Sequence, residues 1–172
     1  MASWDLGKRE AIQWIRNKFP LDTSILDVGA CDGKWRFLLP DYPNLDAVEA
    51  YIPNAEKIIK AYRTVYVCNI DTLKYDHYDL VIFGDILEHL DVKQAQSVLA
   101  YAKNHADNIL ISVPFEYEQG ALYGNPYEIH AQSDLTPALF EERYPGYSIL
   151  TMPSERYCYY TWEKHKCLQK MQ

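Results

Sequence analysis

The chain has 172 residues, of which 48% are hydrophobic, and it carries a formal net charge of −7 at pH 7. This length and composition allow one well-packed core, so we expect a single domain over residues 1–172. Because phosphate binding needs a net basic surface, the acidic balance argues against nucleic acid as the main partner. No apolar run approaches the roughly 20 residues that span a bilayer, and we expect no membrane partner.

The amino terminus, Met-Ala-Ser-Trp-Asp-Leu-Gly-Lys, lacks the basic and then apolar stretches that mark a signal peptide. Four cysteines show neither a CxxC motif nor a cysteine–histidine ligand spacing: Cys31, Cys68, Cys158 and Cys167. Unpaired thiols are typical of a reducing compartment. We therefore expect a cytoplasmic protein with free cysteines.

Helical and strand-like apolar spacings alternate along the chain, with neither a low-complexity linker nor an internal repeat. The first 20 residues predict an amphipathic helix over about 5–18, with Trp4, Trp14 and Ile15 as apolar residues and Pro20 as its stop. The other predicted helices cover residues 34–40, 53–62, 92–105 and 136–143, with a short helical segment at 86–90. The predicted strands cover residues 24–28, 45–49, 64–68, 78–83, 108–113, 147–152 and 157–162. A polar, tyrosine-rich loop is predicted over residues 114–135.

This alternation predicts an α/β fold. Repeated strand–helix–strand units imply a doubly wound, mostly parallel sheet with helices on both faces. The last two predicted strands, 147–152 and 157–162, have no helix between them, and we expect them to form an antiparallel pair. Ligands in such sheets bind beyond the carboxyl ends of the strands.

Residues 25–33, Ile-Leu-Asp-Val-Gly-Ala-Cys-Asp-Gly, contain the most informative pattern in the chain. A buried strand leads into a loop with two glycines, Gly29 and Gly33, where the backbone can approach a ligand closely before a helix begins. Glu49 follows Gly29 by 20 residues, at the end of the next predicted strand, where a carboxylate suits the two hydroxyls of a ribose. The sequence therefore predicts a site for a nucleoside-containing cofactor.

The glycine spacing distinguishes between two classes of cofactor. A dinucleotide-binding loop has the pattern Gly-x-Gly-x-x-Gly, and Cys31 and Lys34 occupy its second and third glycine positions. The pattern acid-x-Gly-x-Gly-x-Gly is matched at Asp27, Gly29 and Gly33 and broken only at Cys31. This loop resembles the first motif of the class I S-adenosylmethionine-dependent methyltransferases.

Three further segments resemble the same family in the same order, so the resemblance covers nearly the whole chain. They are Glu49, the run Cys68-Asn69-Ile70-Asp71, and the run Gly84-Asp85-Ile86-Leu87-Glu88-His89-Leu90. The last run matches a motif written in many relatives as Asp-x-Leu-Glu-His and is the most specific match. The resemblance implies a Rossmann-like sheet of seven strands, the last of which is inserted antiparallel beside its neighbour.

The resemblance also implies S-adenosylmethionine as the cofactor. Glu49 would bind the ribose hydroxyls, and Ile70 would pack on the adenine. Asn69 or Asp71 would read the exocyclic amine, and the backbone of the glycine loop would cradle the methionine. The implied cofactor-binding residues are Asp27, Gly29, Ala30, Cys31, Gly33, Glu49, Ala50, Asn69, Ile70, Asp71, Gly84 and Asp85.

The catalytic candidates are Asp85, His89 and His130. His89 lies four residues after Asp85, and we expect the two side chains to share a helical face above the cleft. His89 would remove a proton from an acceptor hydroxyl, or it would only orient the loop. Asp85 would also help to hold the ammonium of the cofactor. His130 lies in the loop after the fifth strand, which is expected to shape the acceptor pocket.

Asp85, Glu88 and His89 together offer an alternative role as ligands of Mg²⁺, as in some catechol-type O-methyltransferases with a similar run. Nothing else in the sequence demands an ion, and the expected site contains no metal.

The loop over residues 114–135 bears on the acceptor. Asn125-Pro126-Tyr127 differs by one proline and by its position from the Asn-Pro-Pro-Tyr motif of adenine methyltransferases, so a nucleobase acceptor is not expected. Tyr117, Tyr123 and Tyr127 form an aromatic cluster in the sequence of this loop, which we expect to pack it down.

We therefore expect a methyltransferase that acts on a small-molecule or sugar-like acceptor, at an oxygen. One alternative is a cofactor-binding partner subunit without catalytic activity, and another is a nicotinamide-dependent oxidoreductase. The sequence does not indicate the oligomeric state.

Overall fold

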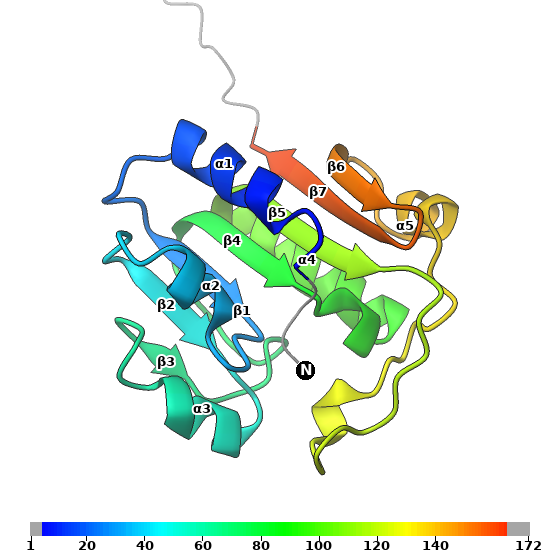
Figure 1. Ribbon diagram of the computed structural model, residues 1–172, viewed down its shortest axis with the longest axis horizontal. Helices are drawn as coiled ribbons and strands as arrows, with labels where there is room; N and C mark the ends of the chain where they lie inside the picture. The colour runs from blue at the N-terminus through cyan, green and yellow to red at the C-terminus, as the bar shows by residue number, and fades with distance from the viewer. Residues whose placement is uncertain (1–4, 165–172) are drawn as a thin grey trace, which may run out of the picture.

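The computed structural model describes residues 5–164 of the chain. Trp4 and Cys167, two residues considered above, lie outside the described residues. Within this range, seven strands form one sheet in the order β3-β2-β1-β4-β5-β7-β6 (Figure 1). The strands are β1 (Ile25–Val28), β2 (Leu45–Val48), β3 (Val65–Tyr66), β4 (Tyr78–Gly84), β5 (Ala106–Pro114), β6 (Ser148–Ser154) and β7 (Tyr157–Glu163).

The first five strands pair parallel with one another, whereas β7 pairs antiparallel with both β5 and β6. The doubly wound, mostly parallel sheet and its carboxyl-terminal antiparallel pair are therefore confirmed. β3 is shorter than the predicted strand at 64–68. It is an edge strand that pairs only through Val65 and Tyr66, and β2, its neighbour, is itself only four residues long.

The helices of the described chain join these strands. They are α1 (Lys8–Lys18), α2 (Lys34–Leu38), α3 (Ile52–Ile58), α4 (Val92–His105) and α5 (Pro137–Arg143), with 3₁₀ turns η1 (Leu87–His89) and η2 (Pro126–Glu128). The first helix begins three residues later than predicted, because Gly7 adopts φ +72 and stands outside the helix as its cap. None of the helices within residues 5–164 combines the length and apolar character needed to cross a bilayer.

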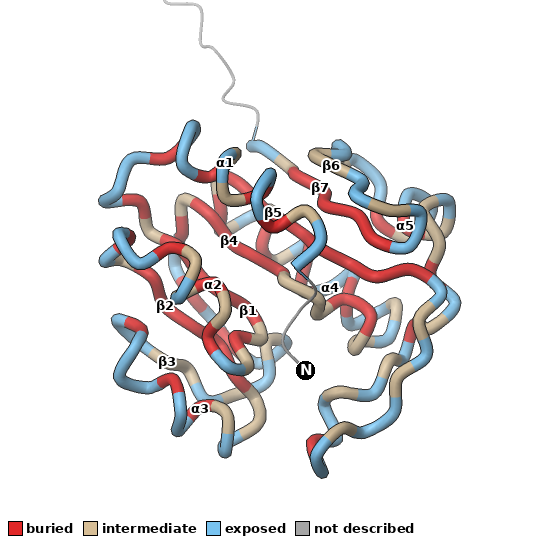
Figure 2. Tube along the Cα trace, viewed as in Figure 1, coloured by how far each residue is buried: buried red, intermediate tan, exposed pale blue. Residues whose placement is uncertain are grey.

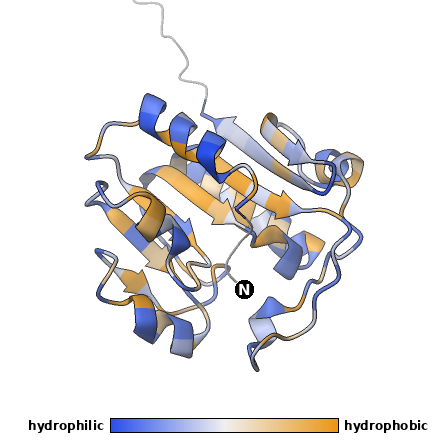
Figure 3. Cartoon of the chain, viewed as in Figure 1, coloured by the Kyte–Doolittle hydropathy of each residue, from blue (hydrophilic) through white to orange (hydrophobic). Residues whose placement is uncertain are grey.

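Alternating side chains of the central strands build a core on each face of the sheet. In β4, Val81 and Phe83 face the side covered by α4, whereas Leu80 and Ile82 face the side covered by α1. Figure 2 shows the central strands buried along their lengths, and Figure 3 shows hydrophobic residues concentrated on the same strands. Such near-continuous burial is typical of a parallel sheet covered on both faces.

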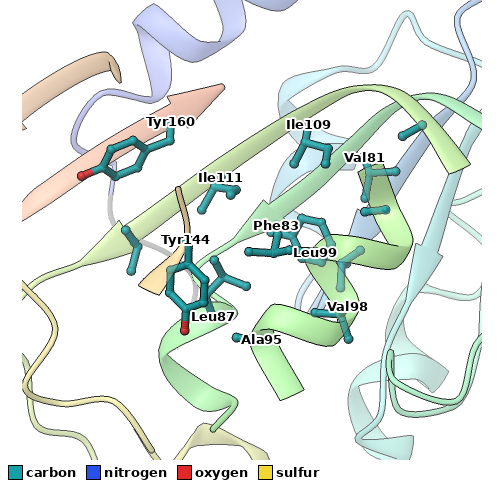
Figure 4. Packing of buried hydrophobic residues seen from close by; sticks show 14 of the residues in the cluster. Val81, Phe83, Leu87, Ala95, Val98, Leu99, Ile109, Ile111, Tyr144 and Tyr160 are labelled. Atoms are coloured by element: carbon teal, nitrogen blue, oxygen red, sulfur yellow. The ribbon is translucent and has the colours of Figure 1, made fainter. Parts of the chain in front are cut away.

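α4 packs on the sheet through the apolar face of an amphipathic helix. Figure 4 shows the contact between its buried residues Ala95, Val98 and Leu99 and the strand residues beneath them. Its amino terminus is closed by a capping box, in which Asp91 accepts a hydrogen bond from the backbone N–H of Gln94 at 2.9 Å. The segment that leads from β4 into α4 therefore has a fixed position.

Candidate active site

The loops that follow β1, β2, β3 and β4 converge at the carboxyl edge of the sheet. Together with η2 they line a cavity of about 280 Å³. Eleven of the twelve predicted cofactor-binding residues line it: Asp27, Gly29, Ala30, Cys31, Glu49, Ala50, Asn69, Ile70, Asp71, Gly84 and Asp85. Gly33 does not line the cavity. It caps α2, and a side chain at this position would contact Ile58 of α3.

The loop after β1 is tightly fixed. Gly29 and Ala30 both donate backbone hydrogen bonds to the carbonyl of Val48, at 2.8 and 3.1 Å. Gly29 has φ +71, and a Cβ at this position would lie 1.9 Å from Cδ1 of Ile86. Glycine is therefore required here by the backbone conformation and by the approach of the segment after β4. Cys31, where the family pattern has glycine, also lies in the left-handed region, at φ +50.

Glu49 lies at the tip of β2 and is 6% exposed. Its Oε2 accepts a hydrogen bond from the backbone N–H of Cys31 at 2.7 Å, and its Oε1 accepts one from Tyr51 at 2.8 Å. Burial raises the pKa of this carboxyl, and the two backbone donors oppose the rise. The carboxylate is thus held at the cavity wall with lone pairs remaining on both oxygens.

Asp27 is buried at the end of β1, where its Oδ2 accepts a hydrogen bond from the Tyr62 hydroxyl at 2.6 Å. Burial raises the pKa of this carboxyl to about 7, against an ordinary value of 3.8. No sequence pattern indicated Tyr62, which reaches Asp27 from beyond the end of α3. This hydrogen bond ties β1 to the segment that follows α3.

Lys8 is a residue near the site that the sequence patterns did not indicate. Its ammonium is buried, has no hydrogen-bond partner among the described residues, and lies 4.3 Å from the ring centre of Trp35, which lines the cavity. Burial lowers the pKa of Lys8. Its spacing from Ala11 and Ile15, both buried in α1, is the helical signal that places it on the inner face of the helix.

Asp85 does not share a helical face with His89, so this prediction was wrong. Asp85 follows β4 directly and has φ +56, and its backbone N–H donates to the carbonyl of Ser112 in β5 at 3.0 Å. Its Oδ1 accepts hydrogen bonds from the Ser112 hydroxyl at 2.9 Å and from the Tyr157 hydroxyl at 2.5 Å. Only Leu87–His89 form a helical turn.

His89 and His130 lie together although 41 positions separate them in the sequence. Their ring centres are 4.6 Å apart, with an interplanar angle of 82°. His89 lines the cavity, whereas His130 lies beside it, outside the lining. Burial lowers the pKa of both imidazoles, that of His89 to about 4, so both are neutral at pH 7. A neutral imidazole at the cavity wall can accept a proton from a bound group.

The tyrosines of the loop over residues 114–135 have three different environments, so they do not pack as one cluster. Tyr117 makes an edge contact with the His130 ring at 5.4 Å, and Tyr127 lines the cavity. Tyr123 is 95% exposed, because it lies in the left-handed turn at the tip of the loop. The loop therefore contributes Tyr127 to the cavity and supports His130 through Tyr117.

No protein-family model and no curated protein matches this sequence. Solved structures do match its fold. The structure of DhpI in complex with SAH (S-adenosylhomocysteine) superposes with a TM-score of 0.69 at 14% identity, over 91% of this chain and 83% of that one. An S-adenosylmethionine-dependent methyltransferase from Clostridium acetobutylicum superposes with a TM-score of 0.69 at 15% identity, over 94% of this chain and 93% of that one.

The chain has the class I methyltransferase fold. A third match is the amino-terminal domain of EvdMO1, crystallised in the presence of SAH and D-fucose, with a TM-score of 0.64 at 19% identity over 94% and 82% of the two chains. The seven-stranded order found here, with β7 inserted between β5 and β6, is the arrangement that the resemblance implied. The methyltransferase fold thus places the cavity at the strand ends, where the sequence predicted it.

Proposed function

We propose that the protein is an S-adenosylmethionine-dependent methyltransferase that acts on an oxygen of a small-molecule or sugar-like acceptor. The observation that carries this proposal is the Glu49 carboxylate. It is buried, it is fixed by two backbone N–H groups, and it lines the cavity beside the glycine loop. A carboxylate in this position suits a ribose diol.

The other walls fit the rest of the cofactor. Ile70 offers an apolar surface for the adenine, and Asn69 and Asp71 flank it with polar groups. The loop at Gly29 and Ala30 would hold the methionine part. When bound, S-adenosylmethionine supplies a methyl group on a sulfonium, which is already an activated leaving group. The chain then has to align the acceptor and exclude water.

His89 is the residue we assign to the acceptor proton. It lines the cavity, and its low pKa leaves it as a neutral base at pH 7. His130, in ring contact with His89, supports it. Asp85 is assigned to the cofactor side, because its carboxylate is oriented by Ser112 and Tyr157. The D-fucose present in one structure of similar fold supports a sugar-like acceptor.

The second candidate function is a cofactor-binding partner subunit without catalytic activity. Cys31 favours it, because a side chain in the left-handed region of the glycine loop narrows the space next to the cofactor. A nicotinamide-dependent oxidoreductase is the third candidate. It is less favoured, because Cys31 and Lys34 replace two glycines of the dinucleotide pattern.

Calorimetric titrations with S-adenosylmethionine, SAH and NADH separate these functions, in combination with a methyl-transfer assay over hydroxyl, amine and carboxyl acceptors. The proposed function predicts binding of the first two ligands and transfer to a hydroxyl acceptor. Binding without transfer to any acceptor supports the partner subunit, and binding of NADH alone supports the oxidoreductase. We also propose a cytoplasmic location, which the unpaired Cys31, Cys68 and Cys158 support.

A further inference from the structure

Three potential ligand groups meet next to the cavity. Glu88 and His89 come from η1, and His130 comes from the loop after β5. One ligand atom from each lies within 4.8 Å of the others. Glu88 and His89 are adjacent in sequence, so the fold has to bring in only His130 to complete the group.

Nε2 is the nitrogen that each imidazole has available for this group, because Nδ1 of each lies near a backbone carbonyl. Nδ1 of His130 lies 2.7 Å from the carbonyl of Tyr117, and Nδ1 of His89 lies 3.3 Å from the carbonyl of Ile129. A carbonyl only accepts, so Nδ1 carries the hydrogen and Nε2 keeps a free lone pair. Histidines that bind metals usually donate their other N–H to a backbone carbonyl or a carboxylate in this way.

The Glu88 carboxyl is buried and not fully hydrogen-bonded. It is 1% exposed, and its Oε2 has no hydrogen-bond partner among the described residues. Its Oε1 lies 3.9 Å from Nε2 of His89, which is beyond hydrogen-bond distance. Burying a carboxyl oxygen without a partner is costly, and a cation at this point would remove the cost.

The group is also rigid. The backbone N–H of Gln132 donates to the carbonyl of Glu88 at 3.0 Å. The side-chain amide of Gln132 donates to the carbonyls of Leu87 and Leu90, at 2.8 and 2.9 Å. These bonds fasten the segment that carries His130 to the turn that carries Glu88 and His89. Preorganisation of this kind is what an ion site needs.

We propose that Glu88, His89 and His130 bind a divalent first-row transition ion such as Mn²⁺. Two imidazole nitrogens and one carboxylate favour such an ion over Mg²⁺ or Ca²⁺, which prefer oxygen ligands. Asp85, which the sequence pattern offered as a ligand, is instead bonded to Ser112 and Tyr157. The sequence alone favoured a site without metal, because nothing else in it demands an ion. The position of His130 beside the other two residues is visible only in the structure.

The ion would face the acceptor side of the cavity, since His89 lines it. A hydroxyl bound to such an ion has a lowered pKa and a fixed orientation. With the ion bound, Nε2 of His89 is a ligand and no longer accepts the acceptor proton, so the ion replaces His89 as the group that promotes loss of this proton. This role depends on the proposed function, whereas binding of the ion does not.

A second group of three potential ligands provides an internal comparison. It consists of His77, Asp79 and Asp107 and lies at the amino ends of β4 and β5. His77 is exposed, and its Nε2 already lies 3.5 Å from Asp107. Asp79 accepts hydrogen bonds from the backbone and hydroxyl of Ser24, at 2.8 and 2.6 Å. These groups have their partners, and we expect no tight ion binding there.

The test is a titration of the metal-free protein with Mn²⁺, in which electron paramagnetic resonance measures the concentration of free ion. We expect one tight site per chain. Glu88→Gln and His130→Asn should each weaken binding at least tenfold, whereas His77→Asn should leave it unchanged. If Glu88→Gln does not fold, His130→Asn, on a surface loop, decides the result.

Equal affinity in the wild type and His130→Asn, or loss of binding in His77→Asn, would overturn the proposal. An SAH titration of each variant separates this test from that of the function. A protein that binds Mn²⁺ but not SAH keeps the ion site and loses the methyltransferase assignment. A protein that binds SAH but not Mn²⁺ keeps the methyltransferase assignment and overturns the ion site.

Discussion

The carboxylate of Glu49 accepts a hydrogen bond from the backbone N–H of Cys31 at 2.7 Å, and this bond ties the tip of β2 to the loop after β1. The acid that is expected to bind the ribose thereby also fixes the loop that is expected to hold the methionine. Because both segments are fixed by one side chain, changes at position 49 should affect both cofactor affinity and stability.

Replacement of Glu49 by alanine should weaken SAH binding by about 1.5–3 kcal/mol, because the contact to the ribose hydroxyls is lost. The exposed Asp41 serves as the control, since its removal deletes one acid that does not line the cavity. Calorimetry on Glu49→Ala and Asp41→Ala measures both effects. An unchanged affinity in Glu49→Ala would mean that the ribose does not bind at β2.

Replacement of Gly29 by alanine should destabilise the fold by roughly 2–4 kcal/mol, from the left-handed backbone and the contact with Ile86 together. The double variant Gly29→Ala/Ile86→Ala removes the contact but keeps the backbone strain. Urea denaturation of the two single variants and the double variant gives their coupling. We expect the double variant to be more stable than the sum of the single effects predicts, and strict additivity would contradict a close approach of Ile86 to position 29.

The stability of the cofactor-free protein should depend on pH through Asp27. The folded-state pKa of about 7 lies above the ordinary value of 3.8, so folding favours the protonated carboxyl. The resulting stabilisation is fully present below pH 3.8 and is lost as the pH rises through 7. Asp27→Asn resembles the protonated form and does not titrate. Relative to this variant, the wild type should lose about 4 kcal/mol between about pH 4 and pH 8.

Urea denaturation of both proteins at a series of pH values checks this difference. Tyr62→Phe is a useful companion, because the Tyr62 hydroxyl favours the ionised carboxyl and its removal should raise the pKa of Asp27 further. Parallel stability profiles for wild type and Asp27→Asn would show that Asp27 is not titrating in this range.

Removal of the helix cap by Asp91→Ala should lower the free energy of unfolding by about 1 kcal/mol. Asp91 holds the first turn of α4 through the backbone N–H of Gln94, and α4 covers one face of the sheet. Thermal denaturation measures the loss. Because Asp91 does not line the cavity, SAH affinity should stay the same, and a large drop in affinity would mean that the cap of α4 also holds the cofactor site.

The central strands β1, β2, β4 and β5 followed from local patterns, because each is mostly apolar and buried and each motif lies at a strand end. The antiparallel insertion of the last strand was predicted from the family resemblance. Glu49 and the glycine loop were predicted for the same reason. The strand predicted at residues 64–68 was too long, since β3 contains only two residues. The length of an edge strand depends on its pairing with the neighbouring strand as well as on β propensity.

Side-chain partners between distant segments could not be predicted in this way. Asp85 was assigned to a helical face, but the sheet bond from its N–H to Ser112 holds it in a left-handed turn. The meeting of His89 and His130 depends on the path of a long loop that Gln132 fastens in place. Lys8 was missed because a charged residue in an amphipathic helix is ordinarily expected on the outer face.

The most direct test of cofactor binding at the strand ends is a calorimetric titration of the purified protein with SAH. We expect one site per chain with a dissociation constant on the order of micromolar, which corresponds to about 8 kcal/mol. If a protein that circular dichroism shows to be folded does not bind SAH at high micromolar concentrations, this result would contradict cofactor binding at the strand ends.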